Sequence, residues 1–219
     1  MDPALFYPLK NSGTEYMGDT TLSLTVTDAG TITIPSGTLL VCDPFAQFIG
    51  LSHGLVYDVP AGDYPTKVTI ANIPGKTPVN AYLSVVFANT EPVTFEQPYP
   101  HRNPDEIPIP SAMRTDGVGL DSGAAAVVDA AAAEAFTAST DLDSFTDYIH
   151  TDAPDGWFNL LRDHNGIAQT PLPDHKENMI LARSGYDAGF YPIVAGYDRN
   201  HTMVSLHVDF LVVGGHPYD

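Results

Sequence analysis

A histidine and an aspartate stand two positions apart near the end of the chain, in Ser205-Leu206-His207-Val208-Asp209. Residues two apart on a β-strand point to the same face. His207 and Asp209 can therefore share a divalent metal ion or act as an acid–base pair. Asp198, at the turn expected before this strand, would add a third oxygen ligand. A solvated sheet face carries such residues as well, and we favour that simpler interpretation.

Two acidic turns are further candidates. Asp121-Ser122-Gly123 and the loop 184–189 can each present a hydroxyl or a carboxylate in a cleft. A nucleophilic serine needs a base within hydrogen-bond reach, and no histidine is placed locally to supply one. Ser and Asp also bond turn amides, and Gly accepts positive φ, so turn formation explains both segments without any chemistry.

Cys42 and Asp43 follow a short apolar run and form a third candidate. Cys42 as a nucleophile would require a nearby cation that lowers the pKa of its thiol. Free cysteines are among the most buried residues, so a cysteine that ends a strand, followed by an aspartate that caps the turn, is the interpretation we favour.

The common local signatures of catalysis are absent. The sequence holds no G-x-x-x-x-G-K-[ST], G-x-G-x-x-G, G-x-S-x-G or H-E-x-x-H motif, no paired cysteines and no calcium loop ending in Glu. No cofactor is evident, and a divalent metal on Asp198, His207 and Asp209 is the one possibility that the residues suggest.

The charge restricts the class of partner. Nine Lys and Arg stand against 27 Asp and Glu, which gives a formal net charge of −18. Such a surface repels nucleic acid and anionic lipid, whose binding depends on protein cations. It attracts cationic proteins over long range. With a single cysteine and no signal peptide or membrane span, the expected compartment is the cytoplasm.

Apolar alternation dominates the elements that must position these residues. It predicts a hairpin over 21–34 that turns at 28–30, and two short helices. Further strands are expected at 39–42, 55–59, 67–71, 79–87, 123–128, 178–183, 190–196 and 202–213. The helices are expected at 130–136, capped by Asp129, and at 142–150. Whether 124–133 is strand, helix or both is open.

The remaining segments are expected to be irregular. They are the N-terminal residues 1–20, the Pro-rich crossing loop 91–116 and residues 151–175. The pattern predicts one domain over 1–219. Its class is mainly β, at the margin of α+β, with an antiparallel β-sandwich or open barrel and one or two short helices.

Six short motifs, in order, resemble the uncharacterised bacterial "domain of unknown function 4241" family over about residues 36–213. They are Cys42-Asp43-Pro44, the stretch 60–65 ending in Tyr64-Pro65, Asp121-Ser122-Gly123 with Asp129, Ser184-Gly185 through Tyr191-Pro192, Gly196-Tyr197-Asp198 and Asp209-Phe210. The resemblance implies no activity, substrate or cofactor.

One loop departs from the family pattern, which resembles S-G-x-G-D-G-x-Y-P. Asp187 takes the place of the middle glycine, and Ala188 stands where the acid is expected. A ligand or catalytic role of that acid would be lost or shifted in this chain.

Two hypotheses of function follow. The first is a soluble, acidic, non-enzymatic binding protein that engages a protein partner, for example a basic toxin. The second is a hydrolase or metal-dependent enzyme whose loop-borne carboxylates gather with His207; its candidate residues are Asp43, Asp121, Ser122, Asp198, His207 and Asp209. Convergence of these side chains in one pocket would favour the enzyme, and scattered capping roles would favour the binding protein.

Overall fold

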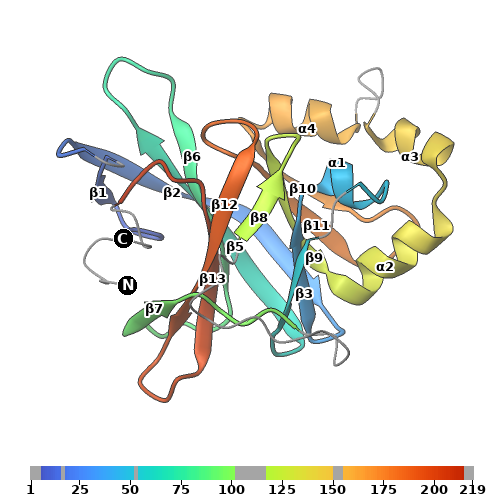
Figure 1. Cartoon of the computed structure of the whole chain (residues 1–219), viewed down its shortest axis with the longest axis horizontal. Helices are drawn as coiled ribbons and strands as arrows, with labels where there is room; N and C mark the ends of the chain where they lie inside the picture. The colour runs from blue at the N-terminus through green and yellow to red at the C-terminus, as the bar shows by residue number, and fades with distance from the viewer. Residues whose placement is uncertain (1–5, 16–17, 52–53, 102–116, 150–154, 215–219) are drawn as a thin grey trace.

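The computed structural model describes residues 6–15, 18–51, 54–101, 117–149 and 155–214. Within them the chain is mainly β, in two antiparallel sheets, as the alternating pattern predicts (Figure 1). The strands are β1 (Ser12–Thr14), β2 (Thr21–Ile34), β3 (Thr38–Cys42), β4 (Leu55–Asp58), β5 (Gly62–Asn72), β6 (Val79–Val86), β7 (Thr94–Glu96), β8 (Gly117–Leu120), β9 (Ala124–Asp129), β10 (Ile167–Pro171), β11 (Asn178–Arg183), β12 (Gly189–Tyr197) and β13 (Met203–Asp209). The helices are α1 (Pro44–Gln47), α2 (Ala130–Ser139), α3 (Leu142–Ile149) and α4 (Trp157–Asp163).

The elements stack in three layers (Figure 1). The first is an eight-stranded sheet, a curled half-barrel in the order β1-β2-β5-β6-β13-β12-β7, with β8 paired to β12. The second is a five-stranded sheet in the order β10-β11-β9-β3-β4. One apolar core fills the space between the sheets, and another lies between the second sheet and the helices.

Strands β3 and β9 lie in the middle layer and are buried on both faces. Val41 and Val127 belong to the core between the sheets, whereas Leu40 and Val128 pack on the helical side. A sheet covered on both sides needs continuous apolar runs rather than alternation.

The stretch 124–133 is both strand and helix, because β9 ends at Asp129 and α2 begins at the next residue. This change of structure confirms Asp129 as the predicted N-cap.

The hairpin expected over 21–34 is wrong. β2 continues through this region as one strand of 14 residues, and β5 pairs with nearly all of it. Asp28 pairs with Lys67 and Gly30 with Thr66, which leaves Ala29 as the extra residue of a β-bulge. Leu22 and Leu24 before the bulge and Ile32 and Ile34 after it all belong to the apolar core between the two sheets.

Three segments expected to be irregular contain short elements. β1 lies in 1–20, β7 in 91–116, and α4 with β10 in 151–175; residues 102–116 of the crossing loop lie outside the described residues. β1, β7 and β10 each pair with a longer neighbouring strand, so tertiary pairing stabilises them where their own sequence pattern is weak. The described helices number four rather than one or two, and none is long and apolar enough to cross a membrane.

Candidate functional site

Asp43 is a buried structural anchor. Its side chain is 1% exposed and lies just after β3, where Oδ1 accepts hydrogen bonds from the amides of Phe45 (2.9 Å) and Ala46 (3.2 Å) at the start of α1. Ser122 donates its amide to Oδ2 at 2.7 Å and its hydroxyl to Oδ1 at 2.8 Å. The carboxylate therefore caps a helix and holds a turn 79 residues away in sequence.

Asp129 repeats this arrangement at the end of β9, the neighbour of β3. It is also 1% exposed; Oδ1 accepts from the amide of Ala132 at 3.0 Å and Oδ2 from the amide of Ser36 at 2.9 Å. Because β3 and β9 are antiparallel, the two aspartates clamp opposite ends of this strand pair. Both carboxylates are occupied by backbone amides.

The motifs on the 121–123 turn and the loop 184–189 lie against each other. The Ser184 amide donates to the carbonyl of Gly123 at 2.8 Å. Ser184 Oγ and Tyr191 Oη both donate to the carbonyl of Asp187, at 2.5 and 2.8 Å. Together with the bonds from Ser122 to Asp43, these contacts join three of the family motifs at one structural junction. Asp121 stays exposed beside it.

Asp187 occupies a left-handed conformation, with φ of 64°. Glycine accepts this conformation without strain, and aspartate is among the residues that tolerate it best. A glycine, which the resemblance predicts at this place, would fit the same conformation. The Asp187 carboxylate is solvent-exposed, and its residue contributes to the junction through a backbone carbonyl.

The three metal-ligand candidates do not converge. Asp198 Oδ1 accepts from the amides of Asn200 and Thr202 in the turn between β12 and β13. Asp209 Oδ1 accepts from the amide of Leu211 at 2.8 Å. Both ring nitrogens of His207 bond to serines. Among the described residues, no three His, Cys, Asp or Glu side chains lie together in a way that could hold a metal ion.

His207 lies on a covered face of the eight-stranded sheet rather than on a solvated one. It is 1% exposed, and Phe6 and Phe95 pack against the imidazole with ring centroids at 5.6 and 5.9 Å. Nε2 is 2.8 Å from Ser205 Oγ, and Nδ1 is 2.8 Å from Ser84 Oγ on β6. Burial lowers the pKa of His207 to about 3, so the imidazole is neutral at physiological pH.

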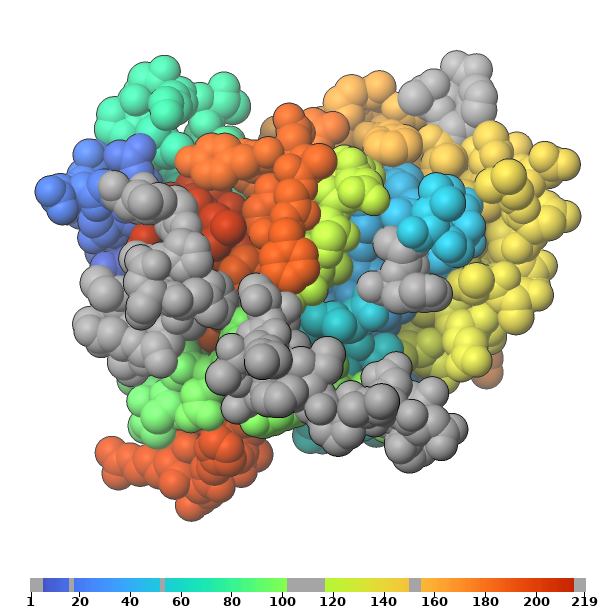
Figure 2. All heavy atoms as spheres, viewed as in Figure 1, coloured from blue at the N-terminus to red at the C-terminus, as the bar shows by residue number. Residues whose placement is uncertain are grey.

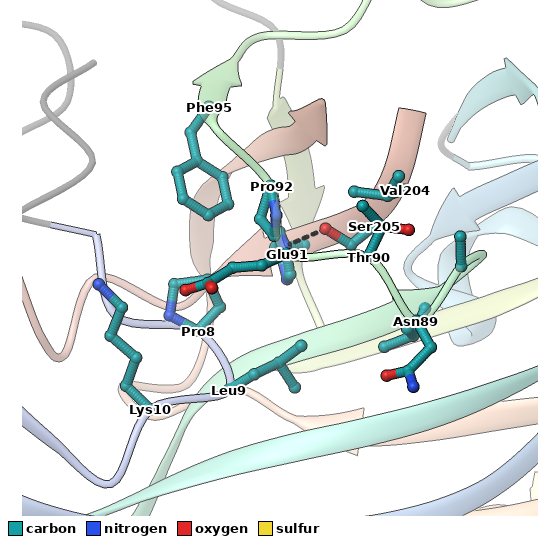
Figure 3. A pocket seen from close by; sticks show the side chains of 13 residues that line it. Pro8, Leu9, Lys10, Asn89, Thr90, Glu91, Pro92, Phe95, Val204 and Ser205 are labelled. Carbon is teal, nitrogen blue, oxygen red and sulfur yellow. Dashed lines mark hydrogen bonds between the residues drawn. The ribbon is translucent and has the colours of Figure 1, made fainter. Parts of the chain in front are cut away.

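A pocket of about 440 Å³ opens beside this hydrogen-bonded row (Figure 3). The segments 8–10 and 88–92 form much of its wall, and Phe95 and Val204 contribute apolar surface. Ser205 and His207 line it as well and are hydrogen-bonded to each other, and a dashed line marks a hydrogen bond at Ser205 in Figure 3. Among the candidate residues of the sequence, only His207 lines this pocket.

Sequence reasoning missed Ser205 and Ser84 as partners of this histidine. The spacing Ser205-x-His207 on a strand places both side chains on one face and was the available signal. Ser84 comes from a strand more than a hundred residues earlier, and only the pairing of β13 with β6 places it opposite His207. The row resembles a nucleophile, a base and an orienting group in spacing.

The row is nevertheless poorly suited to covalent catalysis. An imidazole with a pKa of about 3 is a weak general base near neutral pH, because catalytic bases work best with a pKa near the ambient pH. β13 also lies between β6 and β12, so its backbone amides are engaged in the sheet and do not form an oxyanion hole around Ser205.

Cys42 should be unreactive in the folded protein. Its side chain is fully buried, and burial together with the neighbouring Asp43 raises the pKa of the thiol above its ordinary value. Because the thiolate is the reactive form, we expect no reaction with Ellman's reagent in native buffer and release of one equivalent of chromophore in guanidinium chloride. Rapid stoichiometric reaction of the native protein would contradict this assignment.

Comparison with known proteins identifies the family but no activity. Neither the curated proteins nor the solved structures contain a match to this chain. The family model described as "Protein of unknown function (DUF4241)" matches residues 32–208, which includes all the junction motifs and His207. The resemblance to this family is therefore confirmed, with Asp209-Phe210 just beyond the matched residues, and the chain belongs to the DUF4241 family.

Proposed function

We propose that this chain is a non-enzymatic binding protein that engages a basic protein partner. The observation that carries the proposal is the use of the aspartates. Asp43, Asp198 and Asp209 accept hydrogen bonds from nearby backbone amides, and Asp121 points to solvent away from them. These carboxylates stabilise turns and helix starts instead of gathering around a substrate, which favours binding over catalysis.

The helical layer offers the surface for such a partner. Residues 115–161, which include α2 and α3, contain no Lys or Arg. Within the described part of these helices, the carboxylates of Glu134, Asp143 and Asp147 are exposed and form no ion pair. Figure 2 shows α2 and α3 (yellow) as a continuous outer edge of the molecule. We call Glu134, Asp143 and Asp147 the helical acidic face.

Asp141 adds to this field between the two helices. Hydrogen bonds from the amide and the side chain of Ser144 lower the pKa of Asp141, so the carboxylate stays ionised under mildly acidic conditions. Unpaired carboxylates on a chain with net charge −18 attract a cationic protein and speed its association. The lone cysteine favours the reducing cytoplasm as the compartment of this interaction.

Charge reversal tests the proposal. The variant E134K/D143K/D147K should weaken binding of a Lys-rich dodecapeptide at least tenfold in low salt, measured by fluorescence anisotropy, because it reverses the attraction locally. The control D19K/D63K/E96K changes the net charge equally at exposed acids elsewhere and should cost less than threefold. Added salt should weaken binding to the wild type, since exposed charges are screened within about 10 Å at 0.1 M.

Two results would contradict the proposal. Equal losses in both triple variants would mean that the peptide responds to net charge alone and that the helical acidic face is no binding surface. Stoichiometric zinc, manganese or calcium in the purified protein, measured by plasma mass spectrometry, would favour the metal-dependent enzyme.

A further inference from the structure

We propose that the pocket beside β13 binds a small, partly apolar molecule through one neutral hydrogen-bonding group that is seated on Ser205. This site is independent of the helical acidic face, and its ligand is a small molecule rather than a protein. Its volume of about 440 Å³ lies within the range of small-molecule sites, which combine apolar walls with a few placed polar groups.

The walls supply the apolar part of the site. Leu9 comes from the N-terminal segment and Pro92 from the segment between β6 and β7, while Phe95 stands above the pocket in Figure 3. Val204 adds a β-branched side chain next to Ser205. A ring or a short branched chain can bury apolar surface against these four side chains.

The buried polar part of the site, Ser205 and His207, carries no formal charge, whereas the charged side chains that line the pocket, Lys10 and Glu91, belong to exposed residues of its wall. Ser205 is 3% exposed and His207 1%, and the same burial that lowers the pKa of His207 to about 3 penalises an ion placed against them. An ionised group placed against Ser205 would give up its hydration there, and neither of these two buried side chains offers an opposite charge. A hydroxyl, a carboxamide or a ketone keeps a hydrogen bond there at much lower cost.

The Ser205–His207–Ser84 row can present either hydrogen-bonding role to a ligand. When Nδ1–H donates to Ser84, Ser205 donates its hydroxyl to Nε2 and its oxygen is left as an acceptor. In the other tautomer Nε2–H donates to Ser205, Ser84 donates to Nδ1, and the Ser205 hydroxyl is free to donate. A proton shift within a neutral ring thus matches the site to a donor or to an acceptor.

Four benzene derivatives test the assignment. Benzamide and benzyl alcohol carry neutral polar groups, benzoate carries a charge, and toluene carries neither. Titrations followed by ¹⁵N–¹H NMR should show millimolar binding of the first two, with shifts concentrated in the amides of residues 9–10, 88–91 and 204–207. Benzoate and toluene should bind at least five times more weakly, because each lacks one half of the complementarity.

Two variants separate the pocket from nonspecific binding. Thr90→Trp places a large ring at the wall of the pocket from an exposed loop position and should abolish the specific shifts. Thr137→Trp, at an exposed position that lines a different cavity beside α2, should leave benzamide affinity within twofold of wild type. Ser205→Ala should remove the preference for benzamide over toluene, and the Thr90 variant keeps the test valid if Ser205→Ala does not fold.

Several outcomes would overturn the proposal. They are the absence of localised shifts with any of the four probes, unchanged benzamide binding in Thr90→Trp, and benzoate binding as tightly as benzamide. Covalent labelling of Ser205 by a fluorophosphonate probe, detected by intact-protein mass spectrometry, would instead show a reactive serine and would overturn the binding role.

Discussion

Asp43→Ala should lower the free energy of unfolding by about 3–5 kcal/mol, measured by urea denaturation, because one buried carboxylate satisfies donors from two distant segments. Its removal leaves the amides of Phe45, Ala46 and Ser122 without their acceptor. The end of β3 and the 121–123 turn then lose their connection. Asp43→Asn keeps one carbonyl oxygen and should lose roughly half as much.

The matched control for Asp43 is its exposed neighbour in space. Asp121 adjoins Ser122 in sequence but points to solvent, so Asp121→Ala should change stability by less than about 0.5 kcal/mol. Equal and small effects of Asp43→Ala and Asp121→Ala would refute the anchoring role. If Asp43→Ala does not fold, Asp43→Asn still allows the comparison.

Asp209→Asn should make the protein progressively more stable than wild type as the pH rises from about 4 to 7. Burial raises the pKa of Asp209 from its ordinary 3.8 to about 7, against the opposing hydrogen bond from the Leu211 amide. Between these values the folded state holds a proton that the unfolded state has released. Raising the pH therefore lowers the free energy of unfolding of the wild type, by up to about 1.4 kcal/mol per pH unit.

His207 changes stability with pH in the opposite direction. Burial lowers its pKa from 6.5 to about 3, so the unfolded state binds a proton below pH 6.5 while the folded state does not. Stability from this group is present above pH 6.5 and is lost as the pH falls toward 3. Between about pH 4 and 6.5 the slopes from His207 and Asp209 oppose each other in the wild type.

The two residues share one face of β13, and their surroundings define the test. Tyr82, on the neighbouring strand, interacts electrostatically with Asp209. Burial and the charge of the Asp209 carboxyl raise the pKa of Tyr82. Urea denaturation of wild type and Asp209→Asn at four pH values from 4.5 to 7.5 isolates the Asp209 contribution, since Asn can still accept from Leu211. A stability difference that does not change with pH would contradict the buried, protonated carboxyl. Asp209→Asn should also expose the slope from His207, with stability rising up to about pH 6.5.

Local pattern alone predicted several of the strands and the first residues of α2 and α3. Alternation or continuous apolar runs located β3, β6, β9 and β11, and Asp129 predicted the start of α2 because helix capping depends on neighbouring residues. The hairpin failed for a physical reason. A turn and a β-bulge both use an acidic residue followed by a glycine with positive φ, and the presence of β5 along the whole strand decides between them.

The candidate residues show the same division between local and distant information. The sequence by itself determined the acidity, the six ordered motifs and the position of His207 and Asp209 on the same face of one strand. Only the tertiary structure decided that Phe6 and Phe95 cover that face, that Ser84 lies opposite His207, and that Asp43 meets Ser122. Periodicity records which side of its own strand a residue occupies, whereas burial and hydrogen-bond partners depend on which distant segments pack there. For this reason the same polar residues that fit a solvated face in sequence form a neutral, buried row beside a pocket.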